Sequence, residues 1–165
     1  MNTKDTGQEA PREAPQGVNV RVLAQYVKDI SFENPRAPQS LQEQSGPKTD
    51  ISFQIDTNEI KEEKLKDLYE VVLTVKAKAE RDGGPVFICD VEYATLVSLE
   101  GVPEDKNMPL LFIEVPRISF PFVRRLIADL TQEGGFPPLL LNPVDFTALY
   151  VQKMEEEKAK GKQAN

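Results

Sequence analysis

The segment from Gly134 to Val144, GGFPPLLLNPV, constrains the fold of this chain more than any other. It carries no charge, and it holds the apolar side chains Phe136, Leu139, Leu140 and Leu141. Its three prolines fix φ and remove backbone donors, so the segment can form neither a regular helix nor a central strand. Irregular segments normally run over the surface of a protein. These side chains must therefore pack beneath another element or form a surface that binds apolar groups.

Strand-like alternation of apolar and polar residues occurs in four stretches, as is typical of half-buried strands. These stretches are residues 18–33, 51–56, 69–78 and 86–99. Gly83-Gly84 supplies the positive-φ residues of a hairpin turn. A proline-rich crossover from Asn34 to Asp50 joins the first two stretches, and a charged link over 58–66 is expected between the second and third. On the first strand the pattern puts Val22 and Tyr26 on one face.

Helical periodicity follows the strands. A short apolar segment at 107–115 is expected to end before Pro116, and a second helix to run from Pro121 to Gly134. Asn142 is the expected N-cap of a third helix, which should fray beyond Met154. Strands followed by helices predict an α+β domain, with helices packed on one face of a four-stranded antiparallel sheet. The expected organisation is a disordered tail at 1–17, one domain at 18–154 and a charged, frayed tail at 155–165.

The composition excludes several classes of function. The net charge of −7 argues against binding to nucleic acid or an anionic membrane, since both need a basic surface. The chain has no histidine and a single cysteine, so the commonest general base and zinc ligand are missing, and no intrachain disulfide can form. It also lacks a Gly-x-x-x-x-Gly-Lys phosphate loop. We therefore expect no enzyme activity, no metal, no cofactor and no membrane insertion.

Several blocks of the sequence resemble the SecB family of protein-export chaperones, in colinear order from about Val20 to Tyr150. The blocks are Tyr26–Glu33 (YVKDISFE), Ser119–Phe122 (SFPF) with Arg124, Gly135–Pro137 (GFP) and Asn142–Phe146 (NPVDF). The resemblance implies a SecB-like α+β subunit that assembles as a dimer of dimers, a homotetramer. It also implies a cytoplasmic, ATP-independent chaperone that keeps unfolded preproteins competent for translocation and delivers them to the SecA ATPase.

Two strands carry candidate recognition residues. Asp29 and Glu33 share one face of the first strand, ~13 Å apart. That is too far for an acid–base pair, because even inverting glycosidases keep their carboxyls within roughly 9.5 Å. Ile88, Asp90 and Glu92 share one face of the last strand. The resemblance implies that SecA binds Asp29, Glu33, Ile88 and Asp90.

The resemblance also implies residues for client binding and for subunit contacts. The client-groove candidates are Leu41, Ile51, Phe53, Phe136, Leu139 and Leu141, although apolar residues at these spacings can equally be core. The oligomer-interface candidates are Cys89, Val91 and Tyr93. Cys89 has no neighbouring base and is not expected to be a catalytic thiol. The family often has a tryptophan in the crossover, where this chain has Ser45, so client preference could differ.

Two other functions stay open at this point. One is a small enzyme with Asp and Glu as acid and base, against which the missing histidine and the separated carboxylates count. The other is a generic holdase of the same fold that serves another partner, such as a toxin–antitoxin system. The set Asp29, Glu33 and Asp90 favours the export chaperone.

Overall fold

The computed structural model describes residues 20–43 and 45–163. The strands are β1 (Arg21–Glu33), β2 (Lys48–Glu62), β3 (Leu65–Arg81) and β4 (Gly84–Ser98). The helical elements are η1 (Gln39–Leu41), η2 (Glu104–Lys106), α1 (Asn107–Pro109), η3 (Leu110–Glu114), α2 (Val115–Glu133) and α3 (Phe146–Gln163). The predicted tail at 1–17 lies outside the described residues. Within the described ranges, no helix is both long and apolar enough to span a membrane.

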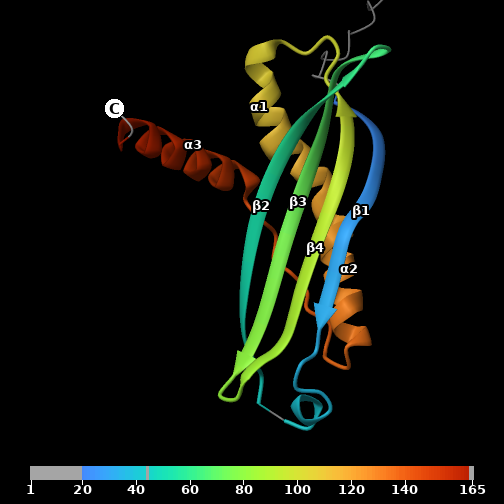
Figure 1. Cartoon of the computed structure of the whole chain (residues 1–165), viewed down its shortest axis with the longest axis vertical. Coiled ribbons are helices and arrows are strands. Elements are labelled where there is room, and N and C mark those ends of the chain that lie inside the picture. Colours follow the sequence, from blue (N-terminus) through green and yellow to red (C-terminus); the bar gives the residue numbers. More distant parts are fainter. Residues whose placement is uncertain (1–19, 44, 164–165) are drawn as a thin grey trace, which may run out of the picture.

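The four strands form one antiparallel sheet in the order β1-β4-β3-β2, with α2 lying along one face (Figure 1). The predicted α+β architecture is therefore confirmed. The charged link expected at 58–66 is wrong in extent, because β2 continues to Glu62 and β3 begins at Leu65. Charged side chains are tolerated there because β2 is an edge strand, where they face solvent and discourage edge-to-edge association.

β1 contains two irregularities that the alternation of its sequence does not reveal. The register shifts between Val22 and Ala24, and again between Val27 and Asp29. Val22 lies opposite Val97, whereas Tyr26 lies opposite Ala94, so the two residues face opposite sides of the sheet. The prediction that they share a face is wrong, because a bulge inserts one residue and inverts the alternation beyond it.

A nearly continuous helical segment runs from η2 through α2, and its interruption expected at Pro116 does not occur. A proline inside a helix clashes with the carbonyl four residues earlier. Here the π-helical turn η3 lies directly before Val115–Pro116, and its wider i→i+5 hydrogen bonding accommodates the ring. α2 packs on β4, where Ser119 Oγ lies 2.7 Å from Thr95 Oγ1 in a buried hydrogen bond.

α3 begins at Phe146, and its N-cap is Asp145 rather than Asn142. The backbone N–H of Ala148 donates to Asp145 Oδ1 at 3.0 Å, and that of Leu149 donates to the Asp145 carbonyl oxygen at 3.1 Å. This carboxylate also favours the positive end of the helix dipole. α3 continues past Met154 to Gln163 and projects away from the sheet (Figure 1).

Candidate functional site

The helix-covered side of β2 borders a row of three hollows. Thr49, Ile51, Phe53 and Ile55 are alternate residues of β2, so their side chains point to the same side. Opposite them lie the Pro-rich segment, which we define as residues 134–145, and the first turns of α3. Because Thr49 and Ile55 are six residues apart, the row extends for about 20 Å. We call this row the β2 groove.

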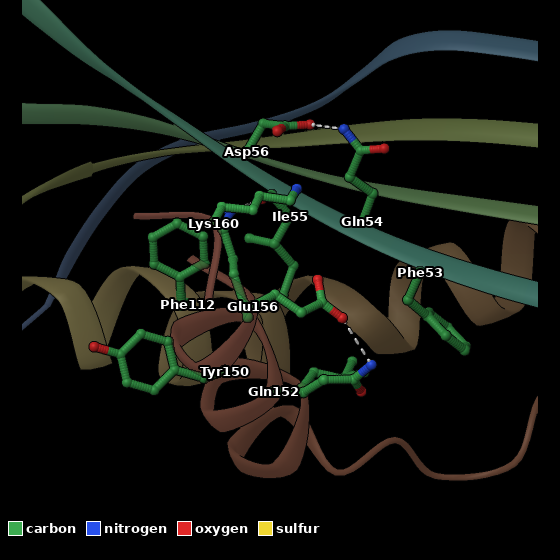
Figure 2. Close-up of a pocket in the computed structure, with 11 residues that line it drawn as sticks. Phe53, Gln54, Ile55, Asp56, Phe112, Tyr150, Gln152, Glu156 and Lys160 are labelled. Atoms are coloured by element: carbon green, nitrogen blue, oxygen red, sulfur yellow. Dashed lines mark hydrogen bonds between the residues drawn. The ribbon is translucent and has the colours of Figure 1, made fainter. Parts of the chain in front are cut away.

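Each hollow of the β2 groove has its own lining. The first, of ≈ 350 Å³, lies between Thr49, Phe87, Phe136 and Leu139. The second, of ≈ 400 Å³, is lined by Ile51, Phe53, Leu141, Val144 and Leu149, among others. The third, of ≈ 520 Å³, lies between Phe53 and Ile55 of β2 and Phe112, Leu149 and Tyr150 (Figure 2). Shared residues join the second hollow to the third, and the strand joins all three.

The third hollow has charged side chains at its margin. Phe112 and Tyr150 stack with ring centroids 5.9 Å apart, and Lys153 Nζ lies 4.3 Å above the Phe112 ring. Lys153 Nζ also donates to the Ile55 carbonyl oxygen at 3.2 Å. Polar side chains of β2 and α3 also line this hollow, among them Asp56, Glu156 and Lys160 (Figure 2). The groove therefore has apolar side chains in all three hollows, and charged side chains of both signs line its first and third hollows.

α2 holds the Pro-rich segment in place through side-chain hydrogen bonds to its backbone. The N–H of Leu139 donates to Thr131 Oγ1 at 2.9 Å, and Arg124 Nε donates to the Leu141 carbonyl oxygen at 2.7 Å. These bonds satisfy backbone groups that a helix or a strand would satisfy internally. The segment can therefore present apolar side chains while remaining irregular.

Five of the six predicted client residues border the β2 groove: Ile51, Phe53, Phe136, Leu139 and Leu141. Leu141 is only 2% exposed and forms the floor of the groove, so its side chain belongs mainly to the core. Leu41 is 44% exposed and lines none of the three hollows. It lies against Gly135, where an added Cβ would come within 3.1 Å of Leu41 Cδ2.

Sequence reasoning missed several groove residues. These residues have the periodicity of core residues, and they are Phe87, Phe112, Leu149 and Tyr150. Nothing in the sequence separates a core position from a groove position. Phe87 shows this ambiguity: it is 4% exposed, yet its ring centroid lies 5.2 Å from that of Phe136 at the margin of the first hollow.

The opposite face of the sheet carries the predicted recognition residues. Across β1 and β4, Asp29 pairs with Glu92, Ser31 with Asp90, and Glu33 with Ile88. This register brings the four predicted residues Asp29, Glu33, Ile88 and Asp90 onto one open face. The same face also holds Lys76 and Lys78, opposite Asp90 and Ile88 on β3. Lys76 Nζ lies 3.2 Å from Asp90 Oδ2, so this acidic patch has a basic border that sequence reasoning did not include.

A buried carboxylate ties three strands together further along the open face. Glu70, on β3, accepts hydrogen bonds from Tyr26 Oη at 2.5 Å, from Lys28 Nζ at 2.7 Å and from Asn58 Nδ2 at 3.4 Å. The Lys28 and Tyr26 bonds lower the pKa of Glu70 below its ordinary value. In turn, the bond to Glu70 and partial burial raise the pKa of Tyr26 to about 12. The Glu70 network thus links β1, β2 and β3 through one charged group.

The three predicted interface residues lie inside the core of a single chain. Cys89 and Val91 have no exposed surface and Tyr93 has 8%, because α2 covers this face of β4. Burial also raises the pKa of the Cys89 thiol to about 11, which disfavours the thiolate. The part that these three side chains play in subunit contacts stays a prediction, because they are covered within this one chain.

Exposed apolar side chains lie beside these three residues. Phe122 of α2 is 47% exposed and stacks on Tyr93 with ring centroids 5.8 Å apart. Val27 of β1 lies opposite Tyr93 in the sheet and is 43% exposed. Ile30 and Ile118 are also exposed. These four residues form what we call the β1–α2 patch.

The sequence of this chain is similar to one family model and to several known proteins of the same name. The family model described as "Preprotein translocase subunit SecB" matches residues 13–157. The "Protein-export protein SecB" of Maricaulis maris is 48% identical, over 91% of this chain and 86% of that protein. The proteins of the same name from Zymomonas mobilis and Bradyrhizobium diazoefficiens are 47% and 45% identical, over 84% and 96% of this chain and 82% and 96% of their own lengths.

A solved structure is similar in fold. It is a SecB-like chaperone from Mycobacterium tuberculosis, in complex with a peptide from an antitoxin. The superposition has a TM-score of 0.61 at 19% identity and covers 76% of this chain and 91% of the other. At this identity the likeness concerns the arrangement of strands and helices alone.

Proposed function

The chain belongs to the SecB family, and from this premise we propose that it is an ATP-independent export chaperone that binds unfolded preproteins along the β2 groove. The single observation that carries the proposal is the groove itself. It presents apolar side chains over about 20 Å, and it runs beside β2, which is an edge strand of the sheet formed by the described residues. An extended client could insert apolar side chains into successive hollows, since alternate side chains of an extended chain point the same way.

We further propose that the acidic patch around Asp29, Glu33, Ile88 and Asp90 binds SecA. The patch lies on the sheet face opposite the groove, so one chain could bind a client and SecA at the same time. Complementary charge would accelerate encounter with a basic partner more than it would add affinity. The Lys76–Asp90 ion pair would have to open for Asp90 to take part.

We propose a homotetramer, a dimer of dimers in the cytoplasm, in which the β1–α2 patch is covered by other copies. β1 is an edge strand, and the exposed residues Val27, Ile30, Ile118 and Phe122 adjoin it or lie on α2. Symmetric closure is the common way to cover such a surface. Sedimentation should show that Phe122→Asp or Val27→Asp shifts the population to smaller species, whereas Val151→Asp on α3 should not.

The alternative is a holdase of this fold that serves a toxin–antitoxin pair. It is favoured only by the peptide bound to the M. tuberculosis structure, whose identity to this chain is 19%. The relatives with 45–48% identity are all named as export proteins. We therefore give priority to export.

The experiment that tests the proposal is light scattering of a denatured preprotein diluted into buffer with and without this chain. We expect the chain to suppress aggregation in the absence of nucleotide, and SecA to release the held preprotein. Aggregation at the same rate with and without the chain would contradict the proposal.

A further inference from the structure

The crossover ends at Pro47 in the structure, because β2 begins at Lys48, and a cluster of charged side chains attaches it to the end of β3. Arg81 is the last residue of β3, and its side chain is 11% exposed. Its Nε donates to the Ser45 carbonyl oxygen at 2.6 Å, and its Nη1 donates to the Ser40 carbonyl oxygen at 2.8 Å. One guanidinium therefore binds two backbone carbonyls that lie five residues apart in the crossover.

Glu43 joins this guanidinium to a second one. Its Oε2 accepts from Arg81 Nη1 at 3.0 Å, and its Oε1 accepts from Arg36 Nη2 at 2.8 Å. The Arg36 guanidinium in turn lies against the β3–β4 turn, where a Cβ on Gly83 would come 2.6 Å from Arg36 Nη2. We call Arg36, Glu43 and Arg81 the crossover clamp.

The crossover clamp lies at the wall of the first hollow of the β2 groove. Arg81, Glu43 and Ser45 line that hollow together with Phe87, Phe136 and Leu139. Ser45 and Gly46 are exposed, so the crossover has little apolar burial of its own at this wall. The position of the crossover at this hollow therefore depends on the clamp.

A guanidinium suits this task better than an ammonium would. Its donors are held in a rigid plane, so contacts to two carbonyls and one carboxylate fix the relative position of all three acceptors. A lysine keeps the charge but concentrates its donors on one flexible atom.

We propose that Arg81 is a positioning residue for client binding: through Glu43 and the carbonyls of Ser40 and Ser45 it holds the crossover at the width that admits an apolar client side chain. Arg81 acts on the client through the crossover. This inference rests on the proposed function of the β2 groove.

The test uses the position of the crossover as its own readout. The chain contains no tryptophan, so Ser45→Trp introduces a single fluorophore at the wall, and only the backbone carbonyl of Ser45 takes part in the clamp. In this background the variants Arg81→Met, Arg81→Lys and Glu43→Gln are compared with Lys78→Met. Lys78 is a matched control, because it is an exposed β3 residue on the opposite face that also forms an ion pair.

Binding of a fluorescein-labelled, reduced and carboxymethylated α-lactalbumin, a permanently unfolded chain, is measured well below the melting transition. Arg81→Met should weaken binding by about five-fold or more and shift the tryptophan emission to longer wavelength. Arg81→Lys should bind the unfolded chain as weakly as Arg81→Met does, and its tryptophan emission should be shifted to the same extent. Glu43→Gln should weaken binding less, and adding it to Arg81→Met should have little further effect, since both act through one network. Lys78→Met should behave as the parent.

Two results would overturn the inference, and they are distinguishable. If the parent binds the unfolded chain and folded Arg81→Met and Glu43→Gln bind it equally well with unchanged emission, the clamp does not position the wall, but the proposed function stands. If the parent without any substitution binds no unfolded chain, the proposed function fails, and this inference fails with it. If Arg81→Met does not fold, Glu43→Gln is measured in its place, because glutamine keeps the shape of the side chain. Unchanged binding and emission in Glu43→Gln would then overturn the inference.

Discussion

The backbone N–H of Leu139 donates a hydrogen bond to the side-chain oxygen of Thr131 at 2.9 Å. Thr131 has no exposed surface, and its hydroxyl in turn donates to the Ile127 carbonyl oxygen at 2.9 Å. A polar side chain of α2 thus attaches a segment whose prolines prevent regular pairing. This arrangement explains how an irregular, apolar segment can be well placed without being a strand or a helix.

Removing this hydroxyl should destabilise the fold. Thr131→Val keeps the approximate shape of the side chain but leaves the Leu139 N–H without an acceptor, which should lower the free energy of unfolding by ~1–3 kcal/mol. Thr147→Val is the matched control, because Thr147 is exposed on α3 and should change stability by less than about 0.5 kcal/mol. Urea denaturation followed by circular dichroism measures both. Equal stability of the two variants would show that the Thr131 bond contributes nothing.

Two neighbouring leucines of the Pro-rich segment should respond in opposite ways. Leu141 is 2% exposed, so Leu141→Ala should cost ~2–5 kcal/mol of stability. Leu140 is 58% exposed, so Leu140→Ala should cost less than about 0.5 kcal/mol. Thermal melting of the two variants checks this difference, and a comparable loss in both would contradict the assignment of Leu141 to the groove floor.

The Glu70 network should make stability depend on acid pH. Lys28 and Tyr26 lower the pKa of Glu70 in the folded chain. The ionised carboxylate therefore stabilises the fold fully at pH values above its unfolded pKa, near 4.5, and this stabilisation is lost as the pH falls through its folded pKa. Glu70→Gln should therefore be less stable at neutral pH and should lose less stability between neutral pH and strongly acidic pH. The measurement is the free energy of unfolding as a function of pH. If it falls equally steeply for the parent and for Glu70→Gln below pH 4.5, this linkage is contradicted.

Tyr26 should produce the opposite dependence at alkaline pH. Its pKa is raised from 10.0 to about 12, mainly by the hydrogen bond to Glu70. Because the pKa of Tyr26 is raised by folding, the protonated phenol stabilises the folded state at pH values below its unfolded pKa. This stabilisation is lost as the pH rises from 10 to 12. The pKa values of Tyr69 and Tyr93 are raised too, so the measurement is the difference between the parent and Tyr26→Phe. No difference in slope over this window would contradict the role of Tyr26.

Reversing charges on the open sheet face should weaken binding to SecA. Asp29→Lys with Asp90→Lys replaces attraction by repulsion and places a second cation beside Lys76. Asp129→Lys is the matched control, because Asp129 is an exposed carboxylate on α2, away from this face. Titration calorimetry should show clearly weaker SecA binding for the double variant alone, with client binding unchanged. Normal SecA binding by the double variant would show that the patch is elsewhere.

Much of the fold follows from the sequence because its causes are local. Alternation over 51–56 and 69–78 gives the strands and their faces, and the order of strands and helices gives the layers. The bulges of β1 do not follow, because their effect appears only when β1 pairs with β4. Asn-Pro is a good helix start, so the sequence favours Asn142 as the cap of α3, whereas the structure uses Asp145, an equally good cap three residues later.

The site was less predictable, since it depends on contacts between distant residues. Alternation puts Asp29 with Glu33 on one face of β1 and Asp90 with Glu92 on one face of β4, but only the pairing of the two strands brings these two sets together. Leu139 and Leu141 look alike in the sequence. Only their packing against α2 and β2 leaves Leu139 half-buried and places Leu141 at the floor of the groove. Arg81 resembled an ordinary turn residue, because its carbonyl partners lie about 40 positions earlier in the chain.

The most direct test of the account is site-specific cross-linking of an unfolded client to the β2 groove. The only cysteine, Cys89, is fully buried and can be replaced by alanine, so one new cysteine can carry a benzophenone probe. Asn142→Cys places the probe on an exposed residue of the second hollow, and Ser52→Cys places it on β2 facing the opposite side of the sheet. We predict that a permanently unfolded polypeptide forms adducts with the probe at 142 and few with the probe at 52. Equal yields at the two positions, or a higher yield at 52, would contradict it.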